Sequence, residues 1–427
     1  MPREITWLEI VMGCGLLIGG AMLLGALLQA TQQNQLRRWA IILSILLFLV
    51  PFIWGEFRGN TQHDIVRDAL PFWFLIGIPI LLIYPANNAN RNALIKLITA
   101  IVLFVGISTA TTFFYGAFSR FDNLTQVLEF AHRGWGGIAK EVQAAQACTG
   151  YRSSRRSCSQ TLKATPEERA KQLEEWEHLA TLLLKLYEPA MLFTSIFLTS
   201  WGVILVTRSW RKMPMGILLL GCGLFVSYGF MIVGLRAYTG LFATAFFCAS
   251  LTQIKKTGFY IRVLPFAALG LVFIWPHIVS VVQLLWLKQQ MMGTNGKAGE
   301  WIAVFSTISA SPQTLLFGIG WGGTFENPIL LNDTTRFTHS LLSFYLLKTG
   351  IMGLIALVLI FTALVLTVLK MFGPVRPLSL ERLIVLFASI PVMIIGVLFE
   401  PTYKMLSYGI ILSLLILTLP TTSQQST

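Results

Sequence analysis

The sequence predicts an all-α polytopic membrane protein with about eleven or twelve transmembrane helices and a helical loop on its outer side. Two observations predict this fold class. The chain has 427 residues, of which 55% are hydrophobic and only 12% are charged, whereas a soluble globular protein carries about 25% charged residues. The mean hydropathy of +0.69 arises from repeated apolar runs, each close to the roughly 17 to 25 residues that cross a bilayer core.

The apolar runs give eleven predicted spans. The first has neither the short apolar core nor the small-residue cleavage site of a removable signal peptide, so we interpret it as a retained span. The predicted spans cover residues 7–29, 39–55, 69–85, 93–115, 188–207, 213–234, 237–253, 259–285, 340–369, 383–399 and 403–419.

The net charge of +13 could indicate nucleic-acid binding, but its distribution favours a membrane orientation instead. Alternate loops are rich in Lys and Arg, and Glu381 is the only acid in them. Because cytoplasmic loops retain Lys and Arg during insertion, we expect these loops and the C-terminus inside, and no nucleic-acid partner. With eleven spans the N-terminus lies outside, and one missed helix would reverse that expectation. The basic loops are 30–38, 86–96, 208–212, 254–257 and 370–382.

Two long polar segments then fall on the outer face and divide the chain into five parts. These parts are N-terminal helices (1–115), an outer insertion (116–187), central helices with Arg236 (188–285), an outer loop expected to act as a lid (286–338) and C-terminal helices (339–427).

Five cysteines bear on the orientation. In "CTGYRSSRRSC", Cys148 and Cys158 lie in the polar insertion, and on an oxidising outer face we expect them to form a disulfide. Two free thiols there would instead mean that the orientation is inverted. Cys14, Cys222 and Cys248 lie in apolar runs, where we expect them to pack, and no cysteine spacing indicates a metal site.

The stretch "KAGEWIAVFSTISASPQTLLFGIGWGGTF" opens the functional part of the outer loop. Trp301, Phe305 and Ile308 have helical spacing, which predicts an amphipathic helix at the membrane surface. The glycines of "GIGWGG" allow tight turns after it. A dinucleotide-binding interpretation of these glycines would need a preceding strand, which the pattern does not provide.

Cations gather on the outer side around one histidine. Arg236 lies in the only break between two apolar runs, and His339 begins the helix of "RFTHSLLSFYLLKTGIMGLI", which Gly350 and Gly353 interrupt. Taken singly, Arg236 could be a snorkelling helix-end arginine and His339 a capping residue. Together with Lys297 and Arg336 they can reach one outer cavity, which suits an anionic substrate whose reaction moves a proton. The four residues that we expect at this site are Arg236, Lys297, Arg336 and His339.

These stretches resemble the O-antigen ligase and O-antigen polymerase family over roughly residues 225–370. That family has an arginine at the outer end of a middle helix, a basic residue four positions before an aromatic, then Pro and GxG, and a histidine opening a helix with GxxGL. Two departures are that Lys297 replaces an arginine, with loss of its bidentate fork, and that Ser340 replaces a common asparagine. The matching residues are Arg236 in "GLRAYTG", Lys297, Trp301, Pro312, "GIG" at 318–320, and His339 with "TGIMGL" at 349–354.

The resemblance implies a GT-C-like glycosyltransferase of the bacterial inner membrane that acts in lipopolysaccharide biosynthesis, with its active site facing the periplasm. It would transfer a glycan from undecaprenyl diphosphate to an acceptor sugar hydroxyl with inversion. The acceptor would be the lipid A core for a ligase or another lipid-linked glycan for a polymerase, and the motifs do not separate these. The partners implied are thus the glycan donor, the acceptor and membrane lipid.

The resemblance also assigns roles to residues. His339 would accept or orient the proton of the attacking hydroxyl, and Arg236 would stabilise the departing diphosphate, helped by Lys297 or Arg336. The further candidates for substrate binding, Tyr238 and Trp301, stand in the same motifs. No acidic metal cluster is evident in the sequence, so we expect neither a metal nor another cofactor.

A transporter or flippase of an anionic or lipid-linked substrate is the alternative from a different class, because it too would have many spans and a basic cavity. It should show inverted repeats with paired broken helices, and no convincing repeat is found. A membrane polymerase of peptidoglycan strands is a third possibility, for which the sequence offers no convincing signature.

Overall fold

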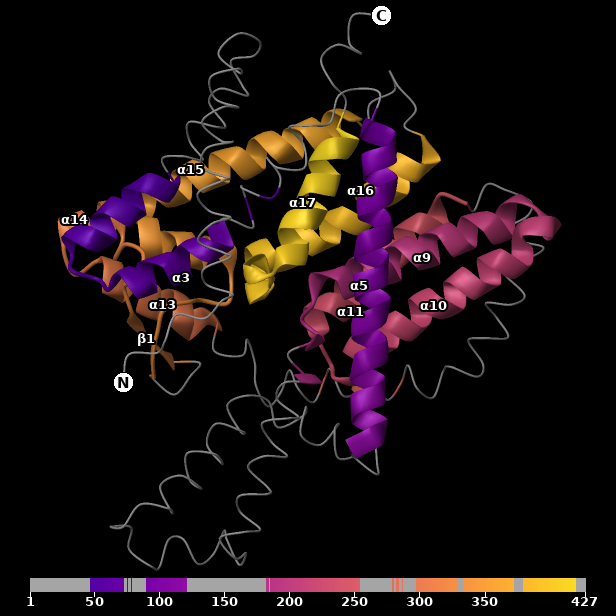
Figure 1. The fold of residues 1–427 in the computed structure, drawn as a ribbon, viewed down its shortest axis with the longest axis horizontal. Helices are drawn as coiled ribbons and strands as arrows, with labels where there is room; N and C mark the ends of the chain where they lie inside the picture. The colour runs from indigo at the N-terminus through magenta and orange to yellow at the C-terminus, as the bar shows by residue number, and fades with distance from the viewer. Residues whose placement is uncertain are drawn as a thin grey trace, which may run out of the picture.

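The computed structural model of the chain describes residues 47–72, 75, 78, 90–120, 182–183, 185–253, 279, 282–283, 286, 297–328, 333–371 and 379–419. Over these ranges the protein is mostly helical, with one small antiparallel sheet (Figure 1). The principal helices are α3 (Gln62–Phe72), α5 (Arg91–Arg120), α9 (Pro189–Arg208), α10 (Met213–Ile232), α11 (Arg236–Leu251), α13 (Lys297–Ile308), α14 (Pro312–Phe317), α15 (Leu341–Met371), α16 (Leu380–Ile394) and α17 (Leu406–Thr418).

Five helices of the described ranges are long and apolar enough to cross a membrane, so the chain is a membrane protein. They confirm the predicted spans at 93–115, 188–207, 213–234, 340–369 and 383–399. The helices run over Arg91–Ala117, Pro189–Arg208, Trp210–Ile232, Leu341–Leu369 and Leu380–Phe399.

Other predicted spans are shorter or lie outside the described residues. A short apolar helix, Leu47–Phe57, falls in the predicted span 39–55, and the helices at 237–253 and 403–419 are the 16-residue α11 and the 13-residue α17. In the last of these, the α-helix begins at Leu406, three residues after the predicted start, because residues 401–404 form the 3₁₀ helix η6 and Met405 is extended. Spans 7–29 and 259–285, and most of 69–85, fall largely on residues that the structure does not describe.

The helix α9 lies at the centre of the helical bundle and is buried along most of its length. Small residues let its neighbours approach closely, as is usual between helices in lipid. A Cβ added at Gly202 of α9 would lie 2.8 Å from the carbonyl oxygen of Gly216 in α10, and one at Gly106 of α5 would lie 2.6 Å from that of Ala190. The backbones of α5, α9 and α10 thus pack at distances that only glycine permits.

The helix α15 is broken at Gly350, which has φ 63° and ψ −162°. The glycine turn that follows α14 crosses this break: Ile319 N donates to Leu347 O at 2.9 Å, and Gly320 N donates to Lys348 O at 3.1 Å. A Cβ at Gly350 would lie 2.5 Å from the Leu316 backbone. The two predicted glycine interruptions, "GIG" and "TGIMGL", are therefore the two sides of one contact.

A helix is confirmed at the predicted place, as α13, but its predicted apolar stripe is partly wrong. Ile308 is buried, because residues 300, 304 and 308 share the face that packs against the first turns of α15. Ile302, at 71% exposure, joins Trp301 and Phe305 on the outer face instead. That outer face is apolar, as a membrane-surface helix requires.

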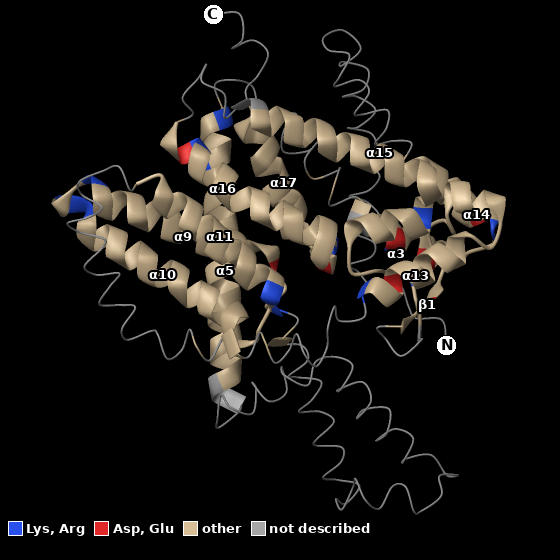
Figure 2. Ribbon diagram, turned by 180° about the vertical axis from the view of Figure 1, so that it is seen from behind, with Lys and Arg blue, Asp and Glu red and all other residues tan. Residues whose placement is uncertain are grey.

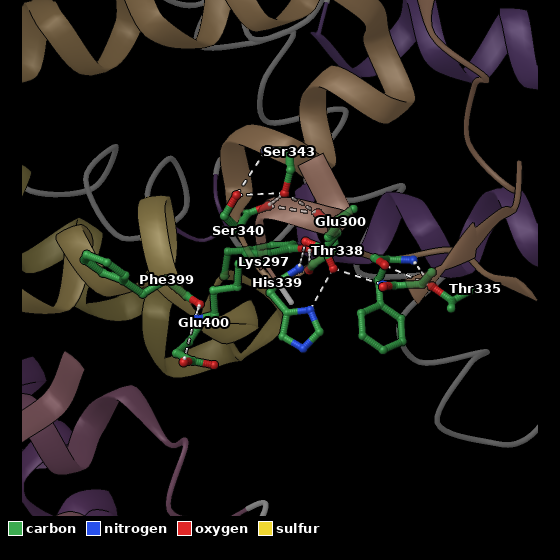
Figure 3. Close-up of polar contacts among 12 residues, drawn as sticks. Lys297, Glu300, Thr335, Thr338, His339, Ser340, Ser343, Phe399 and Glu400 are labelled. Atoms are coloured by element: carbon green, nitrogen blue, oxygen red, sulfur yellow. Dashed lines mark hydrogen bonds and ion pairs between the residues drawn. The ribbon is translucent and has the colours of Figure 1, made fainter. Parts of the chain in front are cut away.

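A short hairpin, absent from the sequence prediction, leads from the glycine turn to His339. Its strands are β1 (Phe325–Asn327) and β2 (Asp333–Thr335), paired antiparallel with Glu326 opposite Thr334. The hairpin brings the residues before α15 back to the first turn of α13, where Asn327 and His339 both bond to Glu300, and so fixes the position of His339 (Figures 1 and 3).

Candidate active site

His339 is held at two points by one carboxylate. Glu300 of α13 accepts a hydrogen bond from the His339 backbone N–H at 2.9 Å and lies 2.7 Å from the imidazole Nδ1 (Figure 3). The same carboxylate also accepts a hydrogen bond from the side-chain amide of Asn327 in β1, at 2.9 Å. The Glu300 side chain is only 2% exposed, so a rigid, desolvated acid fixes both the position and the rotation of the imidazole ring.

The charge of Glu300 sets the tautomer of His339. Burial raises the pKa of the Glu300 carboxyl, but the hydrogen bonds and positive charge of His339 and the Asn327 amide outweigh it and lower that pKa below its ordinary 4.5. An ionised carboxylate only accepts hydrogen bonds, so we assign the proton of the neutral imidazole to Nδ1. Nε2 then carries a free lone pair, and it has no hydrogen-bond partner among the described residues.

Hydroxyl groups hold the backbone on either side of His339. Ser340 caps α15, because its hydroxyl accepts from Ser343 N at 3.1 Å. The Tyr403 hydroxyl of η6 donates to Thr338 O at 2.9 Å. These hydrogen bonds together fix the start of the helix.

Lys297, the first residue of α13, bonds to residues that follow the end of α16. Its ammonium donates to Phe399 O at 2.5 Å and to the Glu400 carboxylate at 3.0 Å (Figure 3). Phe399 closes the π-helical turn η5 (Ile395–Phe399). The structure thus brings Lys297 close to His339, since both flank Glu300, but uses its charge to join two elements.

Arg236 begins α11 and is half-buried. Two residues later, Tyr238 is buried and donates its hydroxyl to Tyr187 O at 2.7 Å. The carboxylate of Glu400, which pairs with Lys297, also acts electrostatically on this phenol. The N-terminal end of α11 therefore lies within electrostatic range of Glu400, the partner of Lys297 in α13.

The remaining predicted residues separate from one another. Arg336 forms an ion pair with Asp64 of α3, which binds the segment before His339 to the N-terminal part of the chain. Trp301 is 37% exposed on the outer face of α13, beside Ile302 and Phe305 rather than on the Glu300 side. Cys148 and Cys158 lie outside the described residues, so their disulfide stays a prediction; Cys222 and Cys248 are free and half-buried.

Sequence reasoning missed a buried ion pair below the glycine turn. Lys348 of α15 is fully buried and donates to Asp68 of α3 at 2.5 Å and to Gly323 O at 2.6 Å. The same Asp68 oxygen accepts from Gly322 N at 2.7 Å. A signal existed, because a lysine inside the predicted span 340–369 has to be paired; the sequence did not say with which acid.

Glu300 was also missed, because single acids on amphipathic helices are usually solvated. Its position three residues after Lys297 was the available signal, since such residues share a helix face. Within the described ranges no group of three or more His, Cys, Asp or Glu residues could hold a metal ion.

Comparison of the chain with protein-family models, with curated proteins and with solved structures returned no match. An imidazole with one nitrogen fixed by a buried carboxylate and the other free is built as a proton acceptor. The side chain of Lys297 lies near it, on the same helix as Glu300 (Figure 3).

Proposed function

We propose that the chain is a membrane glycosyltransferase that moves a glycan from undecaprenyl diphosphate to a sugar hydroxyl. The observation that carries the proposal is the hold of buried Glu300 on His339 Nδ1, with Nε2 left free. Glycan transfer to a hydroxyl needs one oriented proton acceptor beside cations that stabilise a departing diphosphate.

In the proposed step, the acceptor hydroxyl gives its proton to Nε2 of His339 while its oxygen bonds to the anomeric carbon of the donor. The bond from that carbon to the diphosphate oxygen breaks, and the diphosphate leaves with the electron pair. Glu300 stabilises the imidazolium that forms, because its carboxylate faces the Nδ1–H. Attack opposite the leaving group inverts the anomeric configuration.

Arg236 is our proposed stabiliser of the leaving diphosphate. A guanidinium at the N-terminal end of a helix adds its charge to the positive end of the helix dipole. Lys297 and Arg336 each already face a carboxylate, Glu400 and Asp64. We propose that they orient the loops around the donor, and that either one can turn to the phosphate when it binds.

We further propose the finer topology: a GT-C-like arrangement of about eleven or twelve helices in the bacterial inner membrane, with the site facing the periplasm. Segments that the positive-inside pattern assigns to one side do meet at one end of the molecule. The supporting contacts are Trp54 with Gly318, Asp64 with Arg336, Lys297 with Glu400, Thr338 with Tyr403, and Tyr187 with Tyr238.

The test is transfer by the purified full chain. Undecaprenyl-diphosphate-linked glycan is supplied with either the lipid A core or further carrier-linked glycan as acceptor. We expect an elongated or ligated glycan and free undecaprenyl diphosphate with one of the two acceptors, which also decides between ligase and polymerase. Movement of the donor across proteoliposomes without transfer to either acceptor would overturn the proposal in favour of a flippase.

A further inference from the structure

Lys404 is a cation that the mechanism above does not use. It ends the 3₁₀ helix η6 (Pro401–Lys404), at the same end of the molecule as His339. Its ammonium lies 3.4 Å from the centre of the Phe337 ring, and within the described ranges it makes no hydrogen bond or ion pair. Amines held only by an aromatic face retain their capacity to bind an anion.

The surroundings of Lys404 carry an excess of positive charge. Arg67 and Asp68 of α3, Arg336, and Lys348 of α15 all act on it electrostatically. The carboxylate of Asp68 is already occupied by the ammonium of Lys348 and by Gly322 N. Arg336 is likewise paired, with Asp64. Four cations therefore face two carboxylates, and the positive surplus lies with Lys404 and Arg67.

The crowding has a chemical consequence for Lys404. Burial is the largest cause that lowers the pKa of its ammonium, to about 7; attraction to Asp68 opposes this, and repulsion from Lys348, Arg67 and Arg336 adds to it. An anion placed beside the amine would remove much of that penalty. Above neutral pH, such an anion should therefore bind together with a proton.

The position of this cluster relative to His339 suits a leaving group. The Phe337 ring that receives Lys404 lies 6.5 Å, centre to centre, from the His339 ring. The ammonium and the imidazole thus approach the same phenyl ring. A donor whose anomeric carbon is near His339 would extend its diphosphate toward this cluster.

We propose that Lys404, Arg67 and Arg336 form a binding site for the diphosphate of the lipid-linked donor. The site rests on the proposed function for the identity of its ligand, but its chemistry is that of any phosphate-bearing anion. Two guanidinium groups and an ammonium match the two phosphoryl groups of a diphosphate, each of which carries negative charge. On binding, Arg336 exchanges Asp64 for phosphate, which would loosen the contact between α3 and the segment before His339.

The direct experiment measures pyrophosphate binding to the purified full chain by titration calorimetry at pH 8, in two buffers of different ionisation enthalpy. We expect saturable binding with net proton uptake. Lys404→Met keeps the apolar stem on Phe337, and should weaken binding about 10-fold or more and abolish the proton uptake. Arg67→Gln, at an exposed position, should weaken binding and reduce the proton uptake only in part, because Lys404 remains while one source of its repulsion is lost.

The matched control is Lys212→Met, an exposed lysine of the α9–α10 turn, which should bind pyrophosphate as the wild type does. Equal affinity of the Lys404→Met variant and wild type would overturn the site, as would equal weakening by Lys212→Met. Should Lys404→Met fail to fold, unchanged affinity in Arg67→Gln would overturn it instead.

Two further measurements show which phosphate compound the site binds, and whether the glycosyltransferase proposal and the anion-site proposal stand or fall separately. Undecaprenyl diphosphate should compete with pyrophosphate, whereas nanodiscs of phosphatidylglycerol should not; competition by both would make this a general lipid-headgroup site and overturn the diphosphate assignment. Lys404-dependent binding without glycan transfer would reject the glycosyltransferase and keep the anion site. Transfer with an unchanged KM for the donor in Lys404→Met would reject the site and keep the enzyme.

Discussion

The two polar ends of the molecule use charge in different ways. At the end with His339, ion pairs join segments far apart in the chain, and red and blue lie together around α3 and α13 (Figure 2). At the other end, Arg91 of α5 donates to the carbonyls of Leu417 and Leu419, which end α17, and Arg382 donates to the Asn92 amide at 3.0 Å. There the arginines bond to groups at helix ends.

The two ends also differ in the regularity of their backbone. Positive-φ glycines at 318, 320, 322 and 350, the hairpin, and the η5 and η6 turns all lie at the His339 end. Irregular backbone is costly unless its polar groups are satisfied, and here buried side chains such as Asp68 and Lys348 satisfy them. The end with His339 therefore holds side chains in fixed positions, whereas the other end caps the ends of helices.

Removing the imidazole of His339 should have the largest effect on activity, and so tests most directly whether the two ends have different roles. We expect His339→Ala to lower the turnover of glycan transfer by about 10² to 10⁴-fold, the usual contribution of general acid–base catalysis. Arg382→Gln, at the other end, should change turnover little. Initial rates at matched amounts of membrane-inserted protein are the measurement. Comparable rates in His339→Ala and wild type would take histidine out of the mechanism.

Breaking the buried pair under the glycine turn should have the largest effect on stability. Lys348→Met leaves the Asp68 carboxylate without its ion partner, and loss of one partner of a buried pair costs about 3–5 kcal/mol. Adding Asp68→Asn removes the uncompensated charge, and should restore most of the loss. Denaturant unfolding of the two variants in detergent gives the comparison. A double variant no more stable than Lys348→Met would mean that the pair is not what holds the turn.

Much of this architecture could be predicted from the sequence, and the features that could not be predicted depend on tertiary contacts. Hydropathy located five spans to within a few residues, and the glycine pairs marked the break in α15. Period-3.6 patterning found α13 but misplaced Ile308, because an exposed apolar face and a buried one look alike when lipid and protein are both apolar. The direction of a helix face then depends on tertiary contacts.

The site was predictable in its residue types and not in its pairings. His339 and Lys297 were found from their places at element starts, yet the acids that orient them, Glu300 and Glu400, come from other elements. The ion pair between Lys297 and Glu400 joins residues 103 positions apart, and a single sequence carries no information on which of many acids forms it. That is why Arg336 and Lys297 were expected as free phosphate ligands, whereas each faces a carboxylate.

A smaller loss is expected at Arg236. Arg236→Ala should lower turnover by about 10²-fold, the scale of removing one preorganised donor to a developing negative charge. Arg236→Lys should recover part of that, because it restores the charge without the fork. The half-buried position at the start of α11 should tolerate both changes. Turnover within a factor of two of wild type in Arg236→Ala would leave the diphosphate to the Lys404 cluster alone.

The Glu300→Gln variant separates positioning from proton transfer. A glutamine can donate its N–H to Nδ1 and so move the imidazole proton to Nε2, which would lower kcat about 10- to 100-fold with KM nearly unchanged. Stability offers an independent readout. Because folding lowers the pKa of Glu300, its contribution is complete above pH 4.5 and is lost as the pH falls through the lowered value. Unfolding midpoints between pH 6 and 3 should thus fall more steeply in wild type than in Glu300→Gln.

The smallest effect on activity should come from Arg91, the counterpart of these residues at the far end. Arg91→Gln removes charged hydrogen bonds to the last carbonyls of α17, and each such bond contributes about 1.5–3 kcal/mol. We expect a lower melting temperature with unchanged kcat and KM when transfer is assayed well below it. Lys212→Gln, exposed in the α9–α10 turn, should change neither quantity. A fall in kcat for Arg91→Gln at a temperature where the protein is fully folded would show that helix capping at this end is coupled to the site at the other end. The two ends would then not have the separate roles that their charges indicate.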